Sequence, residues 1–293
     1  LLLGYGSQLS ICLKHTTPKS FKCINYTRKE LDINNSEKLF KVFNKIKPDV
    51  IINTAAITDV DFCEKNPDIC FTTNAYALKN ISIFSKKINA LLIHFSSDFV
   101  HSGKSNIKYK EVQNSKPVSI YGKSKLLSEK IIKKYCDKFI IFRISMLYSN
   151  YGNNFYKNII KLLNSSKLIN VYKYQRSNPT NAIDFSKDIW SILEYQFEIK
   201  ENYGIYNYSS SGIAINRYEF AKLILKYIKK YKKNLSTIKP IDPTIEYKKI
   251  RPKHSSLNIN KVSKTFNLKK INHSIAIKRS IEEYYLEYKH LKL

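Results

Sequence analysis

The sequence lacks the features that mark membrane, secreted and metal-binding proteins. It has no uninterrupted apolar run of the roughly 18 residues that a membrane-spanning helix needs, and no signal peptide is visible. Its five cysteines are scattered, odd in number and form no C-x-x-C pair, and its six histidines form no pair at ligand spacing. We therefore expect no membrane contact, no metal site and a reducing, cytoplasmic location.

Acidic residues are also scarce, because 23 Asp and Glu face 51 Lys and Arg, which gives a formal net charge of +28. The lysines are spread over the whole length and accompany heavy use of Ile, Asn, Tyr and Phe, which share AT-rich codons with Lys. A biased genome explains this pattern better than a phosphate-binding face, so we expect no nucleic-acid partner. The charge does favour small anions, such as nucleotides, in any cleft.

Glycine is rare as well, with seven residues in the chain, and two of them, Gly4 and Gly6, lie just after the apolar start. A strand, a glycine turn and a helix in this order form a dinucleotide-binding phosphate loop. A complete fingerprint would have glycines near positions 4, 7 and 10, and Ser7 and Ser10 occupy two of these positions. The motif alone is equally consistent with an ordinary glycine turn.

Strand and helix patterns alternate through the first half of the chain. Apolar runs predict strands over 21–26, 48–56, 90–95 and 138–144, and helical periodicity covers 36–47, 68–87 and 121–134. The alternation predicts an α/β fold with a doubly wound parallel (Rossmann) sheet. Beyond residue 150 we expect helices and loops, with one more strand over 204–210. The predicted Rossmann domain comprises 1–150 and about 181–210, and a smaller discontinuous substrate lobe comprises about 151–180 and 211–293.

A phenol and an amine share one face of the helix predicted after residue 120, since Tyr121 and Lys125 are four positions apart. Ser97 follows a buried strand one loop earlier. An ammonium within one helical turn lowers the pKa of a tyrosine from its ordinary value near ~10. The three side chains suit the donation of a proton to a carbonyl oxygen while hydride reaches its carbon, with Ser97 polarising that oxygen. The Tyr-x-x-x-Lys spacing alone is common by chance.

Taken in order, the motifs resemble those of the extended short-chain dehydrogenase/reductases, and within them the dTDP-4-dehydrorhamnose reductase family. The resemblance runs nearly end to end. It rests on Gly4-x-x-Ser-Gln8-Leu9, Leu31-Asp32-Ile33, the run from Pro48 to Glu64, Asn74-Ala75, Ser96-Ser97-Asp98-x-Val100-x-x-Gly103, Tyr121-Gly-x-Ser-Lys125-x-x-x-Glu129, Arg143-x-Ser145-x-x-Tyr148, Gly152-Asn153-Asn154-Phe155, Gln175-x-x-x-Pro179-Thr180, Gly204-Ile-Tyr206 and Arg251-Pro252-x-x-Ser255-x-Leu257.

The resemblance implies that Ser97, Tyr121 and Lys125 are catalytic, with Tyr121 protonating the C4 ketone oxygen of a dTDP-4-dehydro-6-deoxy sugar. It implies NADPH or NADH as the cofactor, bound by Gly4, Gly6, Ser7, Gln8, Leu9, Asp32, Ala55, Ala56 and Thr58. It implies a nucleotide-sugar pocket formed by Asp98, Met146, Asn154, Gln175, Pro179, Thr180, Arg251 and Ser255. The product would feed a cell-surface polysaccharide, and a homodimer is possible. Basic residues 27–29 suit the 2′-phosphate of NADP, or equally a solvated turn.

Several departures from the family pattern concern the substrate more than the reaction. Met146 replaces the tryptophan that stacks on thymine, Phe99 replaces a tyrosine, and Tyr174 replaces an aspartate. Because Phe99 follows Asp98, the Asp-Glu pair of the related dehydratases is absent, whereas an epimerase stays open. A non-catalytic regulatory subunit, of the type that regulates methionine adenosyltransferase, also stays open because the phosphate loop is altered.

Overall fold

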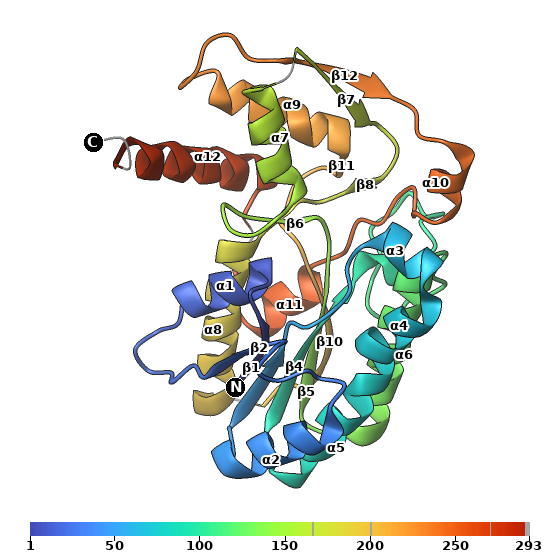
Figure 1. Ribbon diagram of the computed structural model, residues 1–293, viewed down its shortest axis with the longest axis vertical. Helices are drawn as coiled ribbons and strands as arrows, with labels where there is room; N and C mark the ends of the chain where they lie inside the picture. Colours follow the sequence, from blue (N-terminus) through green and yellow to red (C-terminus); the bar gives the residue numbers. More distant parts are fainter. Residues whose placement is uncertain (166, 200, 270, 291–293) are drawn as a thin grey trace.

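The computed structural model describes residues 1–165, 167–199, 201–269 and 271–290. Six parallel strands form a central sheet with the order β10-β5-β4-β3-β1-β2 (Figure 1). These strands are β1 (Leu2–Tyr5), β2 (Asn25–Thr27), β3 (Val50–Asn53), β4 (Leu91–Ser97), β5 (Phe139–Ile144) and β10 (Gly204–Tyr208). The chain runs outward from β1 to β2 and then crosses to β3 on the other side, which confirms the predicted doubly wound sheet. Such a reversal opens a crevice at the carboxyl ends of β1 and β3.

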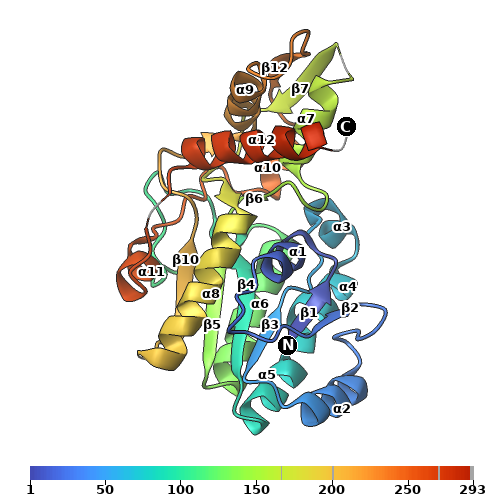
Figure 2. The same ribbon diagram turned by 90° about the vertical axis from the view of Figure 1, so that its left-hand side faces the viewer.

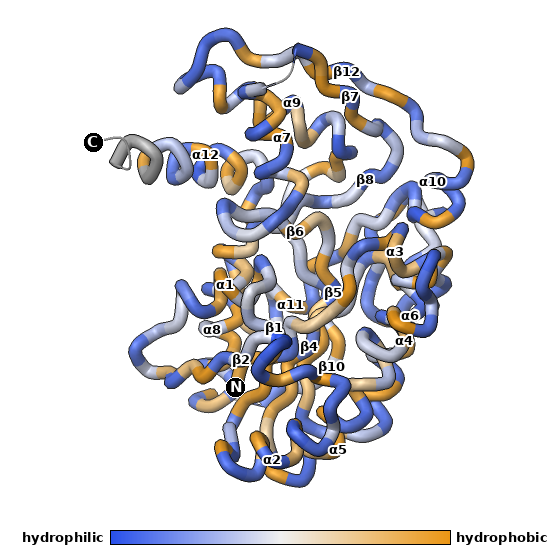
Figure 3. The backbone as a smooth tube through the Cα atoms, viewed as in Figure 1, coloured by the Kyte–Doolittle hydropathy of each residue, from blue (hydrophilic) through white to orange (hydrophobic). Residues whose placement is uncertain are grey.

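Helices cover both faces of the sheet (Figure 2). One face carries α2 (Ser36–Ile46), α5 (Ala77–Lys87) and α6 (Ile120–Tyr135), and the other carries α1 (Gln8–His15) and α8 (Ala182–Glu198). Neighbouring strand residues point to opposite faces, so Leu2 packs with α1 and α8 while Leu3 packs with α2 and α5. The strands are therefore apolar on both sides, as a covered parallel sheet requires, and Figure 3 shows this concentration of apolar residues along them.

A second group of elements, here called the upper lobe, lies beyond the carboxyl ends of the strands (Figure 1). Its apolar cluster includes Tyr156, Phe220, Ile224 and Ile277. Its elements are α7 (Phe155–Leu163), α9 (Arg217–Ile228), α10 (Ile245–Lys249), α12 (His273–His290) and the strand pairs β7–β12 (Leu168–Tyr172, Thr237–Ile241), β6–β9 (Leu147–Tyr148, Thr180–Asn181) and β8–β11 (Arg176–Ser177, Ile215–Asn216). The division of the chain into two ranges stays a prediction, and α11 (Asn260–Thr265) packs against β10 of the sheet.

The structure corrects several element boundaries. β2 starts at Asn25 rather than at residue 21, and the helix predicted over 68–87 contains a π-helical turn, Thr72–Tyr76. Two short helices, α3 (Val60–Lys65) and α4 (Pro67–Phe71), precede this π-helical turn. A short 3-10 turn, Asp98–Val100, follows β4. The expectation of one strand beyond residue 150 was wrong, because the described part of the chain has five short strands there besides β10. Most of them are two residues long, and a pair of residues is too short to show an alternating pattern.

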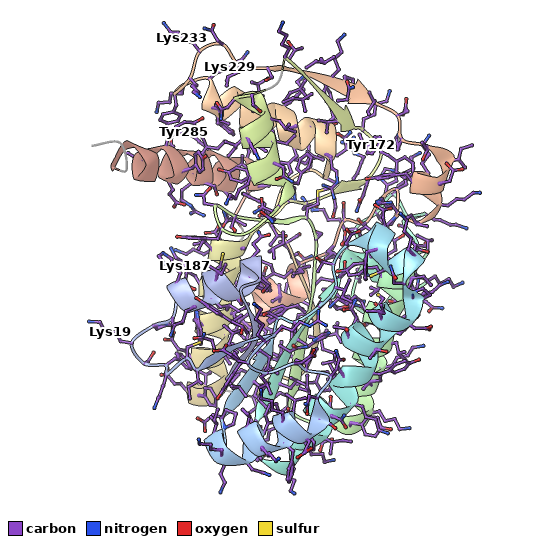
Figure 4. The ribbon with its side chains drawn as sticks, in the orientation of Figure 1. Lys19, Tyr172, Lys187, Lys229, Lys233 and Tyr285 are labelled. Atoms are coloured by element: carbon purple, nitrogen blue, oxygen red, sulfur yellow. The ribbon has the colours of Figure 1, made fainter. Side chains whose placement is uncertain are left out.

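The excess of lysine lies on the outside of both lobes. Lys19, Lys187, Lys229 and Lys233 are exposed and point away from the molecule (Figure 4). Among the described residues, no helix combines the length and the apolar character needed to cross a membrane. The same part of the chain contains no group of three or more His, Cys, Asp or Glu side chains arranged to hold a metal ion.

Candidate active site

A cavity of about 600 Å³ lies between the carboxyl ends of the strands and the upper lobe. The glycine turn after β1, the segment after β3, the end of β4 and the start of α6 line it from the sheet side, and the starts of α7 and α9 line it from above. It brings together many of the residues singled out in the sequence: Gly6, Ser7, Gln8, Leu9, Ala55, Ala56, Thr58, Ser97, Asp98, Tyr121, Lys125, Met146 and Asn154.

Ser97 ends β4 and lies beside the start of α6. Its Oγ donates to Asp98 Oδ1 at 3.1 Å and accepts the backbone N–H of Phe99 at 3.2 Å. Gly122 allows this approach, because a Cβ there would lie 2.2 Å from the Phe99 carbonyl oxygen. Burial raises the pKa of Tyr121, and its hydrogen bond with Ser97 opposes that rise only in part. The phenol is therefore protonated at neutral pH.

Lys125 lies one helical turn after Tyr121 and is almost fully buried. Its Nζ donates a 2.9 Å hydrogen bond to the carbonyl oxygen of Phe95, near the end of β4. Burial lowers the pKa of Lys125 to about 8. The net lowering of the Tyr121 pKa that the sequence predicted is not seen, because burial of the phenol outweighs the opposing effects.

Two buried networks fix α6 on the sheet. Arg143 on β5 forms a bidentate ion pair with Glu129 on α6, at 2.9 and 2.7 Å, and Ser96 donates to the same carboxylate at 2.5 Å. Glu129 lies four residues after Lys125, so this ion pair holds the helix that carries the catalytic candidates against β4 and β5. Such a pair is costly to break, since removal of one partner leaves a buried charge uncompensated.

The second network starts at the end of β3. The His94 ring contacts the Asn53 amide at 3.3 Å and the Ser128 hydroxyl at 3.1 Å, and that hydroxyl donates to the Lys125 carbonyl at 2.7 Å. Burial lowers the pKa of His94 well below its usual value, so its ring is neutral. This histidine therefore positions α6 from within the protein and is not an acid or base for the cavity.

Asp98 receives three serine hydroxyls. Ser97, Ser177 and Ser255 donate to it at 3.1, 3.3 and 2.5 Å. Burial raises the pKa of the Asp98 carboxyl to about 6, against the opposing effect of these hydrogen bonds. The residue lines the cavity as expected and also connects the end of β4 to β8 and to the segment that precedes α11.

The turn between β1 and α1 leaves room for a dinucleotide. Gly4 has a φ of +79° and lies so close to the segment after β3 that a Cβ would be 2.6 Å from the backbone nitrogen of Ala55. Gly6 has a φ of +103°, and a Cβ there would meet nothing within 4 Å. An uncovered backbone turn at the start of a helix, with the small Ala56 beside it, is the cradle that a pyrophosphate needs.

Ser7 and Ser10, which replace two fingerprint glycines, have local roles. The Ser7 hydroxyl is the N-cap of α1, since it accepts the N–H of Ser10 at 3.3 Å. It also contacts the Thr54 hydroxyl at 3.3 Å. Gln8, with its amide oxygen facing β6, accepts the N–H groups of Tyr148 and Ser149 at 3.2 and 2.9 Å. The altered loop is therefore well formed and attached to the upper lobe.

Other sequence candidates lie outside the cavity lining. Asp32 is at the surface and pairs with Arg28 at 3.3 Å, whereas Arg251 pairs with Asp61 at 2.6 Å and stacks on Tyr247. Gln175, Pro179, Thr180 and Ser255 are buried behind the lining. Gly4 supports the turn from below. Direct ligand contacts by these residues stay predictions.

Sequence reasoning missed part of the lining from the upper lobe. Phe155, Arg217 and Phe220 line the cavity, and Asn53 and Phe95 join them from the sheet. A single basic residue at the start of a helical pattern was the only signal for Arg217. The resemblance identified Met146 but did not predict its backbone conformation. Its φ of +41° is left-handed, and its carbonyl oxygen accepts the Thr180 N–H at 3.1 Å.

Comparison with known proteins identifies the family of this chain. The protein-family model of the RmlD substrate binding domain matches residues 1–286. The dTDP-4-dehydrorhamnose reductase of Escherichia coli K12 is 30% identical over 255 residues, covering 86% of this chain and 85% of that protein. The Bacillus subtilis spore coat polysaccharide biosynthesis protein SpsK is 31% identical over 227 residues, covering 77% and 78%.

Among solved structures, the dTDP-4-dehydrorhamnose reductase of Bacillus anthracis in complex with NADP superposes with a TM-score of 0.87 at 30% identity. The match covers 96% of this chain and 98% of that one. The fold is thus shared over nearly the whole length of both chains. The chain belongs to the dTDP-4-dehydrorhamnose reductase family.

Proposed function

We propose that this protein is an NADPH-dependent reductase that converts the C4 ketone of a dTDP-4-dehydro-6-deoxy sugar, of the dTDP-4-dehydrorhamnose type, to the alcohol. The proposal places this step in the biosynthesis of a cell-surface polysaccharide, in line with the name of the B. subtilis relative. The observation that carries it is the convergence of Ser97, Tyr121 and Lys125 in one cavity with the open turn at Gly6.

In this proposal the bound nicotinamide supplies the hydride. Tyr121 carries the proton on its phenol oxygen at neutral pH and gives it to the ketone oxygen of the substrate. The Ser97 hydroxyl, which donates to Asp98 in the structure, turns its single proton to the same ketone oxygen when the substrate binds and so orients it. The Lys125 ammonium, fixed on the Phe95 carbonyl, stabilises the negative charge that develops as the proton leaves Tyr121.

The test is the oxidation of NADPH, followed by absorbance, in the presence of dTDP-4-dehydrorhamnose. Tyr121→Phe should lower kcat by about 10²- to 10⁴-fold, since a general acid contributes that much, and should leave NADPH binding intact. Tyr135→Phe, at the other end of α6, is the matched control. A fall in kcat of less than about tenfold would show that Tyr121 is not the acid.

Failure of the wild-type protein to bind NADPH would favour the regulatory-subunit alternative. Turnover only with a different keto-sugar nucleotide would change the substrate and keep the reaction. Interconversion of C4 epimers without net oxidation of NADPH would instead identify an epimerase. The assay therefore separates the three functions that the sequence leaves open.

We also propose a cytoplasmic location and keep a homodimer as a proposal. All five cysteines are free, and four of them are buried, which suits a reducing compartment.

The short helices around the cavity expose Phe62, Ile69 and Tyr76, which offer apolar surface to a second copy. Sedimentation equilibrium of the wild type and of Ile69→Lys tests the dimer: a mass that is monomeric in both proteins would contradict it.

A further inference from the structure

Arg217 differs from every other arginine of the chain in the part that the structure describes. The other five each pair with a carboxylate: Arg28 with Asp32, Arg143 with Glu129, Arg176 with Glu219, Arg251 with Asp61, and Arg279 with Asp184. Among the described residues, Arg217 has no such partner, and its buried Nε makes no hydrogen bond. It is also the arginine that lines the cavity.

Glu219, the acidic residue nearest to Arg217 in sequence, already interacts with other residues. Glu219 accepts the backbone N–H of Asn216 at 2.9 Å, which forms the capping box of α9 together with the Asn216 side chain. It also pairs with Arg176 at 2.9 Å. The guanidinium of Arg217 instead lies over the Phe155 ring, 4.9 Å from its centroid. The aromatic ring holds the planar group in place while its donors stay available.

The other charged side chains of the cavity lining already have hydrogen-bond partners. The other cationic side chain in it, Lys125, donates to the Phe95 carbonyl. The carboxylate in the cavity lining, that of Asp98, accepts hydrogen bonds from three serine hydroxyls. A guanidinium with free donors can form a bidentate pair with a phosphate, in which two N–H groups donate to two phosphate oxygens. The cavity therefore presents one anchored, unpaired cation to an anionic ligand.

We propose that Arg217 binds a phosphate of the nucleotide-sugar substrate and so determines the preference for diphosphate-linked sugars. This inference rests on the proposed function. It assigns the residue to the substrate rather than to the cofactor, because Arg217 and Phe155 belong to the upper lobe, whereas the open glycine turn belongs to the sheet side. The positive end of the α9 dipole adds to the attraction of an anion at this position.

The test compares Arg217→Gln and Arg217→Lys with Lys222→Gln. Lys222 is exposed on the same helix, so its substitution removes one charge without touching the cavity. Calorimetry with dTDP, thymidine and NADPH should show that Arg217→Gln weakens dTDP binding by about 10- to 100-fold and leaves thymidine and NADPH binding unchanged. Arg217→Lys should restore part of the dTDP affinity. In turnover, KM for the sugar nucleotide should rise by a similar factor, with a change in kcat below about threefold.

Three results would overturn the assignment: dTDP affinity unchanged in Arg217→Gln, an equal loss in Lys222→Gln, or a loss of NADPH affinity in place of dTDP affinity. Thermal unfolding of each variant shows whether the fold is kept, and Arg217→Lys provides a second test if Arg217→Gln does not fold. Failure of the wild type to bind dTDP, UDP or GDP would instead overturn the proposed function itself, and the two failures are thereby distinguished.

Discussion

Ser255 donates a 2.5 Å hydrogen bond to Oδ2 of Asp98 and so joins two side chains that are 157 positions apart in the sequence. The other oxygen of the same carboxylate receives the hydroxyl of Ser97. Through Asp98, the position of Ser97, the proposed catalytic serine, therefore depends on a segment near the carboxyl end of the chain. This connection gives the buried Asp98 carboxylate a structural role in the lining of the cavity.

We predict that Asp98 makes stability depend on pH in a specific window. Burial raises its pKa to about 6 from an ordinary 3.8, so between about pH 4 and 6 the folded protein holds a proton that the unfolded chain has lost. The free energy of unfolding must therefore fall as pH rises through this window, by about 3 kcal/mol at most. Asp98→Asn cannot titrate. The stability of the wild type minus that of the variant, from urea unfolding, should fall from pH 4 to pH 6.5; a constant difference would refute the prediction.

We predict that activity falls above about pH 8 as Lys125 loses its proton. Its pKa is lowered to about 8 by burial, and only the ammonium form can stabilise charge on Tyr121. The profile of kcat/KM against pH should show this fall in the wild type, and Lys125→Arg, whose guanidinium stays charged, should move it to higher pH. If the fall in kcat/KM stays near pH 8 in Lys125→Arg, it arises from the titration of another group.

Cys70 provides the control for that profile. The hydrogen bond from Cys63 lowers the pKa of Cys70 to about 7, and its thiol contacts Ser124, next to Lys125 in the sequence. A limb that arose from this thiol would vanish in Cys70→Ser. We expect the limb near pH 8 to persist in that variant.

The two glycines of the phosphate turn should respond differently to alanine. Both have left-handed backbones, which cost a residue with a Cβ about 1–2 kcal/mol. Gly4→Ala must also displace Ala55, since the new Cβ lies 2.6 Å from its nitrogen, whereas Gly6→Ala points into open space. We expect Gly4→Ala to be the less stable in urea, and Gly6→Ala to keep most stability but to weaken NADPH binding by about tenfold or more. Equal stability losses with unchanged NADPH binding would contradict this account.

Much of the sheet side of the site was predictable from sequence because its signals are local. Ser97 ends an apolar run, Tyr121 and Lys125 are one helical turn apart, and Gly6 follows a strand. The upper lobe gives no such signals. Arg217 and Phe155 meet only because α7 and α9 pack together, and the pairing of Arg251 with Asp61 joins segments 190 positions apart. Partners of this kind are set by tertiary packing, which no short pattern in the chain records.

The return of α8 and β10 to the sheet, between the strands and helices of the upper lobe, constrains how such a protein can be altered. No single cut in the chain separates the lobe that carries Arg217 from the layer that carries Tyr121. A single-crossover exchange between two relatives therefore cannot transplant the upper lobe whole. In this architecture substrate choice is accessible to point substitution at the cavity wall, and grafting would require several simultaneous junctions.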